Sequence, residues 1–541
     1  YSMAEIMRLV DLEALRTRRE QLHQGILLDN AERLFGAQSD FSAADLAAIL
    51  RTSSEPQRWV KRLIGLARER SEGEVSVDSP EFWASRLLHS LGTALRRLTG
   101  TTNQTVGQAF PGLPESWGPG ERHWLTKLSL EVRNDTPVAD WADRLRSAAF
   151  RELGRPIVHT VRSAETTPRC RVRVDELVWV RAPARLDLGG GWTDTPPYSL
   201  ERGGAVINVA VDLNGQPPIQ AYARVVAEPV IRLSSVDGGQ RCEIRSFDDL
   251  LDFQDPGAEF SLPKAALYLS GISPDRPNAG SSLQQVLERF GGGIELTTVA
   301  AIPKGSGLGT SSIMGAVLLS AIRRLMGQVY NRRELFHDVL RLEQALTTGG
   351  GWQDQIGGVV EETKLITTAP GLVPDPYIRF VPATVLDPRE NGEQTLLYYT
   401  GITRLAKNIL QQVVGRYLDR DRQAMRVLRR LHTVASSVAD AMARKDLPEF
   451  GRLIGEVWEL NKQLDPGSTN EQVEALLERV MPYACGAKLL GAGGGGFLLI
   501  VCRSPRNAAA LRRELEAEPP NELARFFDFS VSRTGVVVSA C

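Results

Sequence analysis

The sequence contains little cysteine, and what it has is scattered. Five cysteines (Cys170, Cys242, Cys485, Cys502 and Cys541) are spread over 541 residues, and none stands in a C-x-x-C pair. An odd number of widely separated thiols predicts neither a disulfide framework nor a zinc site. We therefore expect reduced thiols in a cytoplasmic protein.

An excess of either charge and long apolar runs are also missing. Lys+Arg number 64 and Asp+Glu number 65, which gives a formal net charge of -1. Binding along nucleic acid, or through a polybasic membrane anchor, needs clustered excess Lys and Arg. No uninterrupted apolar run reaches the roughly 18 residues that a membrane-spanning helix needs. We expect a packed protein with neither a nucleic-acid partner nor a membrane partner.

The order of the expected elements changes near residue 172. Residues 1–165 predict a helical module, since apolar residues recur at helical spacing after Ser42 and again after Trp59. No catalytic motif stands in this module. Beyond it, β-branched runs such as Ala205–Val211 predict strands, and these alternate irregularly with long amphipathic helices. This mixed order predicts an α+β fold.

Glycine is abundant, with 49 residues that are unevenly spread, and four clusters of them suggest function. The central cluster, P-K-G-S-G-L-G-T-S-S, follows an expected strand (Ile294–Ala301) and opens an expected helix. Glycines let the backbone approach a ligand, and a helix start offers free N–H groups to phosphate. It is not a Walker A loop, because the chain contains no Gly-Lys dipeptide. The candidate phosphate-binding residues are Lys304, Gly305, Ser306, Gly307, Leu308, Gly309, Thr310, Ser311 and Ser312.

A second cluster formally satisfies G-x-G-x-x-G with Gly491, Gly493 and Gly496. A dinucleotide-binding fingerprint must open a helix, whereas here an expected strand, Phe497–Val501, follows. We therefore predict a strand–loop–strand whose bare backbone lets another loop or a ligand pack against it. Its candidate residues are Gly491, Gly493, Gly494 and Gly495.

The two remaining clusters combine glycines with charged residues. Arg181–Pro197 holds Arg185, Asp194 and Trp192 around a G-G-G turn, and a cluster at 349–358 holds Asp354. Glu343 lies eleven residues before Asp354, on an expected helix. Two carboxylates near a phosphate loop suit phosphoryl transfer, because one can hold Mg²⁺ while the other orients or deprotonates the attacking hydroxyl. Taken singly, each cluster could equally be a structural turn.

In this order the clusters resemble the motifs of the GHMP kinase superfamily, the galactokinase, homoserine kinase and mevalonate kinase group. The first motif is matched by Ala182–Asp194, the phosphate loop by Pro303–Ser312, and the third motif by Lys488–Gly496. The resemblance implies a two-lobed kinase behind the helical module. Its N-terminal lobe, similar to ribosomal protein S5 domain 2, would span 172–370, and its ferredoxin-like C-terminal lobe would span 371–541.

Within the superfamily, G-G-G-W-T-D-T-P-P-Y (Gly189–Tyr198) and G-G-W-Q-D-Q (Gly350–Gln355) are similar to the L-fucokinase branch. Galactokinases carry Gly-Glu-His-Thr-Asp where this chain has Gly-Gly-Trp-Thr-Asp, and heptose kinases usually lack the inserted Trp. The resemblance implies ATP-dependent phosphorylation of the anomeric hydroxyl of L-fucose, in salvage toward GDP-fucose. The alternatives are a D-glycero-D-manno-heptose 7-phosphate kinase and an inactive sugar and ATP sensor of the same fold.

The resemblance also implies roles for single residues, with ATP and Mg²⁺ as substrate and cofactor. Asp354 and Arg185 would be catalytic, and Ser311 and Glu343 would bind Mg²⁺. Trp192, with Tyr198 behind it, would form an apolar wall for the C6 methyl group of fucose. The candidate sugar-binding residues are Asp194, Trp192, Gly191, Thr193, Gly351 and Trp352.

Fucokinases often occur joined to a GDP-fucose pyrophosphorylase, so the resemblance implies such a partner, covalent or separate. No nucleotidyltransferase motif is visible in this chain. It opens on Tyr1, without an initiator methionine, and we expect a fragment or a tag remnant.

Overall fold

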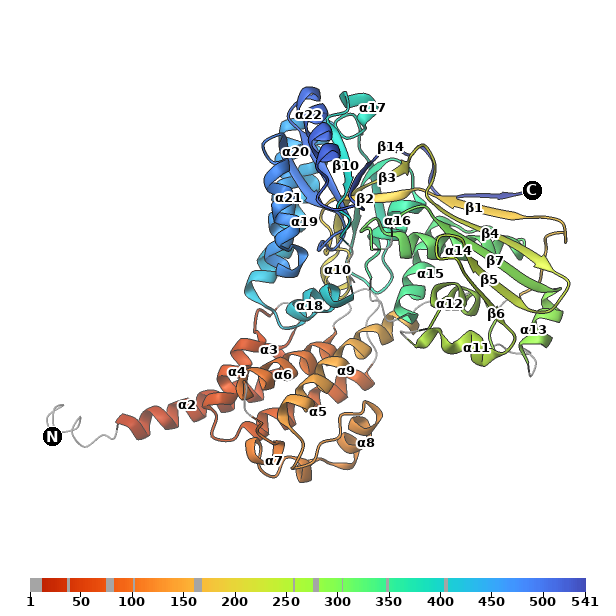
Figure 1. Cartoon of the computed structure of the whole chain (residues 1–541). Helices are drawn as coiled ribbons and strands as arrows, with labels where there is room; N and C mark the ends of the chain where they lie inside the picture. Colours follow the sequence, from red (N-terminus) through yellow and green to blue (C-terminus); the bar gives the residue numbers. More distant parts are fainter. Residues whose placement is uncertain are drawn as a thin grey trace, which may run out of the picture. The chain divides into compact units, whose positions relative to one another are not determined.

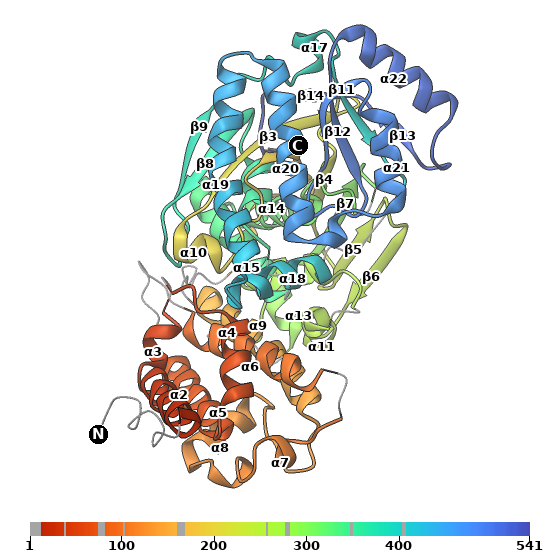
Figure 2. The same cartoon turned by 90° about the vertical axis from the view of Figure 1, so that its left-hand side faces the viewer.

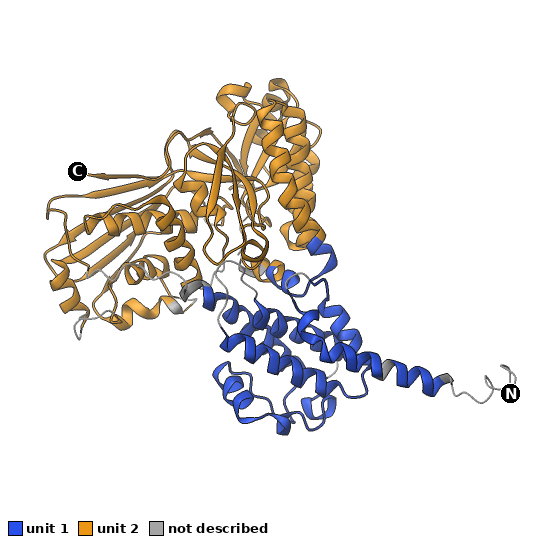
Figure 3. Cartoon of the chain, turned by 180° about the vertical axis from the view of Figure 1, so that it is seen from behind, with its two compact units in different colours: residues 1–156, 414–425 blue, residues 157–413, 426–541 orange. Residues whose placement is uncertain are grey.

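Figure 1 shows the computed structural model of the chain, and Figure 2 shows it turned by 90°. The chain divides into two compact units, coloured separately in Figure 3: residues 1–156 with 414–425, and residues 157–413 with 426–541. The structure describes residues 12–36, 39–73, 82–100, 103–159, 168–255, 258–275, 282–303, 305–346, 350–402 and 407–541. Over these ranges no helix has both the length and the apolar character needed to cross a membrane.

The first unit is built from helices, as predicted. They are α2 (Leu12–Asp29), α3 (Ala31–Leu34), α4 (Ala43–Thr52), α5 (Pro56–Glu72), α6 (Trp83–Thr99), α7 (Val106–Ala109), α8 (Pro119–Lys127) and α9 (Val138–His159), with the 3-10 turn η1 (Pro114–Ser116). Ser42 caps α4 through a capping box with Asp45. Trp59 and Trp141 are fully buried in one apolar core.

A segment from far along the chain completes this helical unit. Residues 414–425 include the end of α18 (Lys407–Leu418) and the start of α19 (Arg422–Ala443). Asp419 accepts the N–H of Ala43 on its carbonyl, and its Oδ1 lies 2.8 Å from Nδ1 of the buried His89. The compact unit is therefore discontinuous, whereas the expected module is the single segment 1–165.

The second unit begins with a six-stranded sheet in the order β15-β1-β4-β7-β5-β6. The strands are β1 (Val178–Ala182), β4 (Ile219–Val226), β5 (Ile231–Ser235), β6 (Gln240–Ile244), β7 (Gly293–Ala300) and β15 (Val537–Ala540). Neighbours are antiparallel except β5 and β7. Helix α14 (Thr310–Leu325) packs on β1 and β4, and α12 (Ser261–Leu269) and α15 (Arg332–Ala345) pack on α14 (Figure 1).

A second sheet of the same unit orders β14-β3-β8-β9, with β2 also paired to β3. The strands are β2 (Ala184–Gly189), β3 (Ala205–Leu213), β8 (Thr363–Thr368), β9 (Pro376–Phe380) and β14 (Phe529–Val531). The short helix α16 (Gln353–Val359) lies against β2 and β3. The other helices of this half are α10 (Tyr198–Arg202), α11 (Phe247–Leu251), η2 (Asp252–Gln254) and α13 (Leu283–Phe290).

The C-terminal lobe has a four-stranded antiparallel sheet in the order β11-β12-β10-β13. Its elements are β10 (Thr395–Tyr399), β11 (Ala484–Leu489), β12 (Phe497–Cys502), β13 (Arg525–Phe527), α17 (Pro388–Asn391), α20 (Leu447–Leu464), η3 (Pro466–Ser468), α21 (Glu471–Val480) and α22 (Pro505–Ala517). Helix α20 packs on β11 (Figure 2). Helices join the first strand to the second and the third to the fourth, which is the ferredoxin-like arrangement.

The structure thus confirms the α+β prediction and the two-lobed organisation. One feature crosses the expected boundary at residue 371. Strands β9, β14 and β15 follow that residue in sequence but belong to the two sheets that carry β1 and β2. The end of the chain therefore returns to the N-terminal lobe.

Candidate active site

The phosphate loop lies between β7 and α14, as the sequence predicts. Gly307 and Gly309 have φ of +76° and +73°, backbone angles that side chains disfavour. Gly309 is the N-cap of α14, so the first N–H groups of this 16-residue helix have no partner within it. Such a helix start attracts anions. Lys304, one of the expected phosphate-binding residues, lies outside the described residues.

The third glycine motif packs directly on the phosphate loop. A Cβ on Gly307 would stand 2.3 Å from the Leu490 carbonyl oxygen, and one on Gly491 would stand 2.8 Å from the Gly307 Cα. The N–H of Phe497 donates to the Ser306 carbonyl at 3.1 Å. The predicted strand–loop–strand is present, and its bare backbone meets another loop. Gly493 and Gly494 approach Ser468 in the same way, and Gly495 approaches Ile402.

Arg185 and Asp354 form an ion pair beside this loop. Arg185, on β2, donates from Nε to Oδ1 of Asp354 at 2.7 Å, and its Nη2 donates to the same oxygen. Its Nη1 donates to the Gly307 carbonyl at 3.0 Å. The Arg185 side chain is 4% exposed and that of Asp354 is 29% exposed. The structure therefore brings the two expected catalytic residues together and presents the carboxylate toward solvent.

Neighbouring carboxylates favour the charged form of the Arg185 guanidinium. Burial acts to lower the pKa of the Arg185 guanidinium, but the carboxylates of Asp354 and Asp187 outweigh burial and raise that pKa. A Cβ on Gly309 would lie 3.1 Å from the Arg185 Cγ and 3.2 Å from the Asp354 Cβ. The turn that opens α14 therefore touches the ion pair itself.

Glu343, on α15, lies on the buried side of α14. The Ser312 hydroxyl donates to Oε1 of Glu343. Burial raises the pKa of the Glu343 carboxyl to about 8, the negative charges of Asp354 and Asp194 add to the rise, and the Ser312 bond opposes it. The sequence pairs Glu343 with Ser311 instead. In the structure Ser311 is exposed, because consecutive helix residues project about 100° apart.

Asp194 joins the same group of carboxylates. Its Oδ2 accepts the N–H of Gln353, at the start of α16, at 3.1 Å. Gly351 lies so close that a Cβ there would stand 1.9 Å from that oxygen. Burial raises the pKa of the Asp194 carboxyl to about 7, and the Asp354 charge adds to the rise. The expected sugar-binding residues Asp194 and Gly351 are thus neighbours of the Arg185–Asp354 pair.

Two other expected sugar-binding residues point into the protein. Thr193 is fully buried, and its hydroxyl donates to the carbonyls of Gly190 and Ala205 at 2.7 and 3.0 Å. Trp352 is 2% exposed, with its ring packed on Gly204. The Thr193 hydroxyl is occupied by hydrogen bonds within the loop, whereas the buried Nε1 of Trp352 has no hydrogen-bond partner among the described residues.

Trp192 differs from these two residues. It is half-buried between buried neighbours, and its φ is +77°. A bulky residue in that region of φ is a genuine outlier, and such strain concentrates at functional sites. Tyr198 is 5% exposed on α10, and Gly191 lies against the Asp187 carboxylate.

A second buried ion pair, which the sequence pattern did not predict, lies beside the first. The Nζ of Lys488 donates to Oδ2 of Asp187 at 2.7 Å and to the Asp187 carbonyl at 2.8 Å. Lys488 is fully buried and Asp187 is 2% exposed. The pair joins the start of the third motif to the strand of Arg185. Charged residues inside otherwise apolar strands were the available signal, because charges are rarely buried unless paired.

The Glu343 carboxylate and the serine hydroxyls near it are oxygen ligands of the kind that Mg²⁺ prefers. Across the described ranges no cluster of three His, Cys, Asp or Glu side chains is placed to hold a metal ion. A cation here would use the Glu343 carboxylate and a hydroxyl, and would complete its shell with phosphate oxygens and water, as Mg²⁺ does in kinases. Burial is the main cause of the raised pKa of Glu343 and Asp194, the Asp354 charge adds to both, and such a cation would relieve that repulsion.

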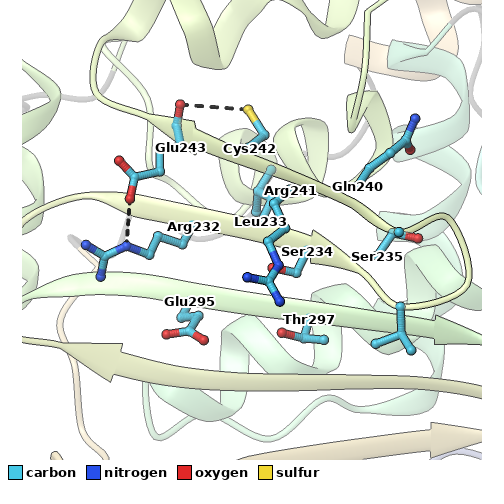
Figure 4. Close-up of a pocket in the computed structure, with 12 residues that line it drawn as sticks. Arg232, Leu233, Ser234, Ser235, Gln240, Arg241, Cys242, Glu243, Glu295 and Thr297 are labelled. Carbon is cyan, nitrogen blue, oxygen red and sulfur yellow. Dashed lines mark hydrogen bonds and ion pairs between the residues drawn. The ribbon is translucent and has the colours of Figure 1, made fainter.

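A groove of about 710 Å³ lies elsewhere, over β5, β6 and β7 (Figure 4). Arg232 and Glu243, which line it, pair with each other at 2.9 Å. None of the residues of the four glycine clusters lines this groove. It is therefore separate from the candidate active site.

Comparison with known proteins supports the resemblance that the motifs carry. Residues 279–361 match the family GHMP kinases N terminal domain, and residues 438–521 match GHMP kinases C terminal. The Lactococcus lactis galactokinase structure in complex with galactose is similar with a TM-score of 0.50 and 18% identity. It covers 67% of this chain and 95% of that one, and supports the fold alone.

Two curated relatives are more similar in sequence. The Bacteroides fragilis protein named L-fucokinase/L-fucose-1-P guanylyltransferase is 43% identical over 393 residues, 72% of this chain and 41% of that protein. The Arabidopsis thaliana protein named bifunctional fucokinase/GDP-fucose pyrophosphorylase is 37% identical over 345 residues, 62% of this chain and 31% of that protein. The chain spans less than half the length of each relative.

Proposed function

Because the chain belongs to the GHMP kinase superfamily, we propose that it is an ATP-dependent sugar 1-kinase whose substrate is L-fucose. The observation that carries the proposal is the Arg185–Asp354 pair, which lies against the phosphate loop and the first turn of α14. The similarity to two proteins named as fucokinases, at 43% and 37% identity, supports L-fucose as the sugar.

The residues of the site would have separate roles in phosphoryl transfer. The phosphate loop and the N–H groups of α14 would bind the ATP phosphates. Both Arg185 bonds to Asp354 end on Oδ1, which leaves Oδ2 to accept the proton of the anomeric hydroxyl. The sugar oxygen then bonds to the γ-phosphorus, the bond from that phosphorus to the β-phosphate oxygen breaks, and ADP leaves. Arg185 stabilises the negative charge that spreads over the transferring group.

Glu343 and a hydroxyl of Ser311 or Ser312 would hold Mg²⁺. When bound, Mg²⁺ supplies positive charge to the β- and γ-phosphate oxygens. The structure contains the buried carboxylate and the hydroxyls that this role needs. Ser311 stays a predicted ligand, and the contact between Ser312 and Glu343 adds Ser312 as a second candidate.

Asp194 and Trp192 would recognise the sugar. A carboxylate is a strong acceptor for sugar hydroxyls, and Asp194 lies next to the start of α16, which carries Asp354. The C6 methyl group of L-fucose needs an apolar surface, and Trp192 is the half-buried aromatic ring of this loop. Tyr198 would support Trp192 from the core.

We also propose that the fucose 1-phosphate product is passed to a nucleotidyltransferase, either joined to this chain or separate. The double names of both relatives support this step, because each includes a second activity on fucose 1-phosphate or GDP-fucose. A cytoplasmic location fits the five free cysteines.

A substrate panel tests the proposal. ADP release is measured with L-fucose, D-arabinose, D-galactose and a heptose 7-phosphate, and the phosphorylated carbon of the product is identified by ³¹P and ¹H NMR. We expect the highest kcat/KM with L-fucose and a phosphate at C1. A preference for heptose 7-phosphate would replace the proposal by the first alternative, and ATP binding without turnover of any sugar would favour the sensor.

A further inference from the structure

A row of four buried polar side chains crosses the lobe beneath α16. Asp187 on β2 is the register partner of Asn208 on β3, and Asn208 is the register partner of Lys364 on β8. Lys488, from the sheet of the other lobe, reaches the end of this row by its ion pair with Asp187. All four are at most 2% exposed. We call these four residues the polar row.

The polar row binds α16 on both sides of Asp354. Nδ2 of Asn208 donates to the carbonyl of Gln353, the residue before Asp354, at 3.3 Å. Nζ of Lys364 donates to the carbonyl of Gly357, three residues after Asp354, at 3.1 Å. The helical turn that carries Asp354 is therefore tied to two adjacent strands through two neighbouring side chains.

The row also fixes the position of Arg185. Asp187 stands two residues after Arg185 on the same face of β2, and Lys488 donates to both its carboxylate and its carbonyl. Gly357 packs directly against the Arg185 side chain, since a Cβ on Gly357 would lie 2.8 Å from the Arg185 Cβ. Lys364 thus holds the carbonyl of the residue that touches the Arg185 stem.

Two buried lysines are a costly way to fill a core. Burial lowers the pKa of Lys364 to about 7, and it also lowers the pKa of Lys488 against the opposing charge of Asp187. Nζ of Lys364 donates to two backbone carbonyls, those of Gly357 and Glu362. Apolar residues of similar volume often stabilise a fold as well as a buried ion pair does, so packing alone does not account for the row.

We infer that the polar row positions the Arg185–Asp354 pair for phosphoryl transfer, a role that rests on the kinase activity proposed above. Lys364 and Asn208 set the height and rotation of α16, while Lys488 and Asp187 set the strand of Arg185. These four are positioning residues, because they act through α16 and β2. Reactions that depend on placement can lose about 10²-fold in rate from a displacement of about 1 Å.

The first test replaces Lys364 by methionine, which keeps the stem and removes the donors. We expect the kcat of Lys364→Met to fall about 10- to 100-fold with the KM for ATP within about threefold of wild type. The melting temperature and circular dichroism, measured alongside, verify that the variant is folded. The matched control is Lys264→Met, because Lys264 is also buried, at 3% exposure, but pairs with Asp252 outside the row; its kcat should stay within twofold of wild type.

A second measurement does not need turnover. Hydrogen exchange of the α16 amides, followed by mass spectrometry without substrate, should be at least tenfold faster in Lys364→Met than in wild type and Lys264→Met. Unchanged exchange in α16 would overturn the inference whether or not the protein phosphorylates L-fucose. Faster exchange with normal kcat would also overturn it, since the row would then serve structure alone. A wild type that is inactive on every sugar would count against the proposed function separately.

The charge-neutral double variant Asp187→Leu, Lys488→Met guards against misfolding from a single unpaired charge. It removes both members of the pair, so no buried charge is left without a partner. We expect it to fold and to show a kcat at least tenfold lower than wild type. A folded double variant with wild-type kcat would refute the role of this half of the row.

Discussion

Glu343 should carry a proton in the ligand-free protein at neutral pH and lose it when Mg²⁺–ADP binds. Burial raises the pKa of its carboxyl to about 8. At pH 7 a group with that pKa is about 90% protonated, and at pH 9 it is about 10% protonated. Coordination of Mg²⁺ needs the carboxylate. Binding at pH 7 should therefore release about 0.9 proton from Glu343 alone.

The assay is isothermal titration calorimetry of Mg²⁺–ADP in two buffers of different ionisation enthalpy, because the difference in apparent heat reports the protons exchanged. Wild type and Glu343→Gln are compared at pH 7 and at pH 9. The difference between them should be about 0.9 proton at pH 7 and about 0.1 at pH 9. Equal proton release by the two proteins at pH 7 would refute the reasoning. Circular dichroism and the melting temperature verify that the variant is folded.

The same pKa predicts the direction in which stability changes with pH. The ordinary pKa of a glutamate is 4.5, and that of Glu343 is about 8 in the folded protein. The folded state therefore keeps a proton that the unfolded chain loses. The resulting stabilisation is complete below pH 4.5 and is lost as pH rises through 8, by about 1.4 kcal/mol per pH unit between these values. Glu343→Gln should flatten the fall of the melting temperature between pH 6 and pH 7.5.

Three further predictions concern other parts of the site. Asp354→Asn should lower kcat by roughly 10²- to 10⁴-fold, the range of a lost general base; near-normal turnover in a folded variant would remove Asp354 from the mechanism. Trp192→Ala should reduce the preference for L-fucose over L-galactose in kcat/KM, by at most about 10²-fold, and an unchanged ratio would defeat the apolar-wall idea. Gly307→Ala places a Cβ 2.3 Å from the Leu490 carbonyl oxygen at φ +76°. It should cost about 1–3 kcal/mol of stability and raise the KM for ATP, whereas in Gly65→Ala the added Cβ has open space and should do neither.

The sequence predicted best where function depends on local backbone. The phosphate loop and the third motif are short runs in which glycine spacing alone indicates bare backbone, and both lie where the sequence places them. Side-chain direction was harder to predict. Ser311 and Ser312 are adjacent, and only the packing of α15 on α14 decides which hydroxyl meets Glu343.

Contacts between segments that are far apart in the sequence could not be predicted from motifs and periodicity. In the sequence, Lys364 is one charged residue at the start of a β-branched run. Its proposed positioning role depends on its register with Asn208 and on its hydrogen bond to α16. The sequence also did not predict that residues 414–425 belong to the helical unit. An amphipathic pattern shows that one face of a helix is buried, but it does not show which other segment covers that face. These two features therefore depend on strand register and on tertiary packing, and neither can be seen in a local sequence pattern.

The balance of charge in the site predicts that the proposed reaction requires a cation. Four carboxylates, Asp187, Asp194, Glu343 and Asp354, stand with two cations, Arg185 and Lys488, among the described residues of the site. In the ligand-free protein, the raised pKa of Asp194 and Glu343 lets protons offset the excess negative charge near pH 7. ATP brings more negative charge into the same space, and a proton neutralises one charge where Mg²⁺ neutralises two. Exchanging the Glu343 proton for Mg²⁺ would therefore let the site accept the nucleotide.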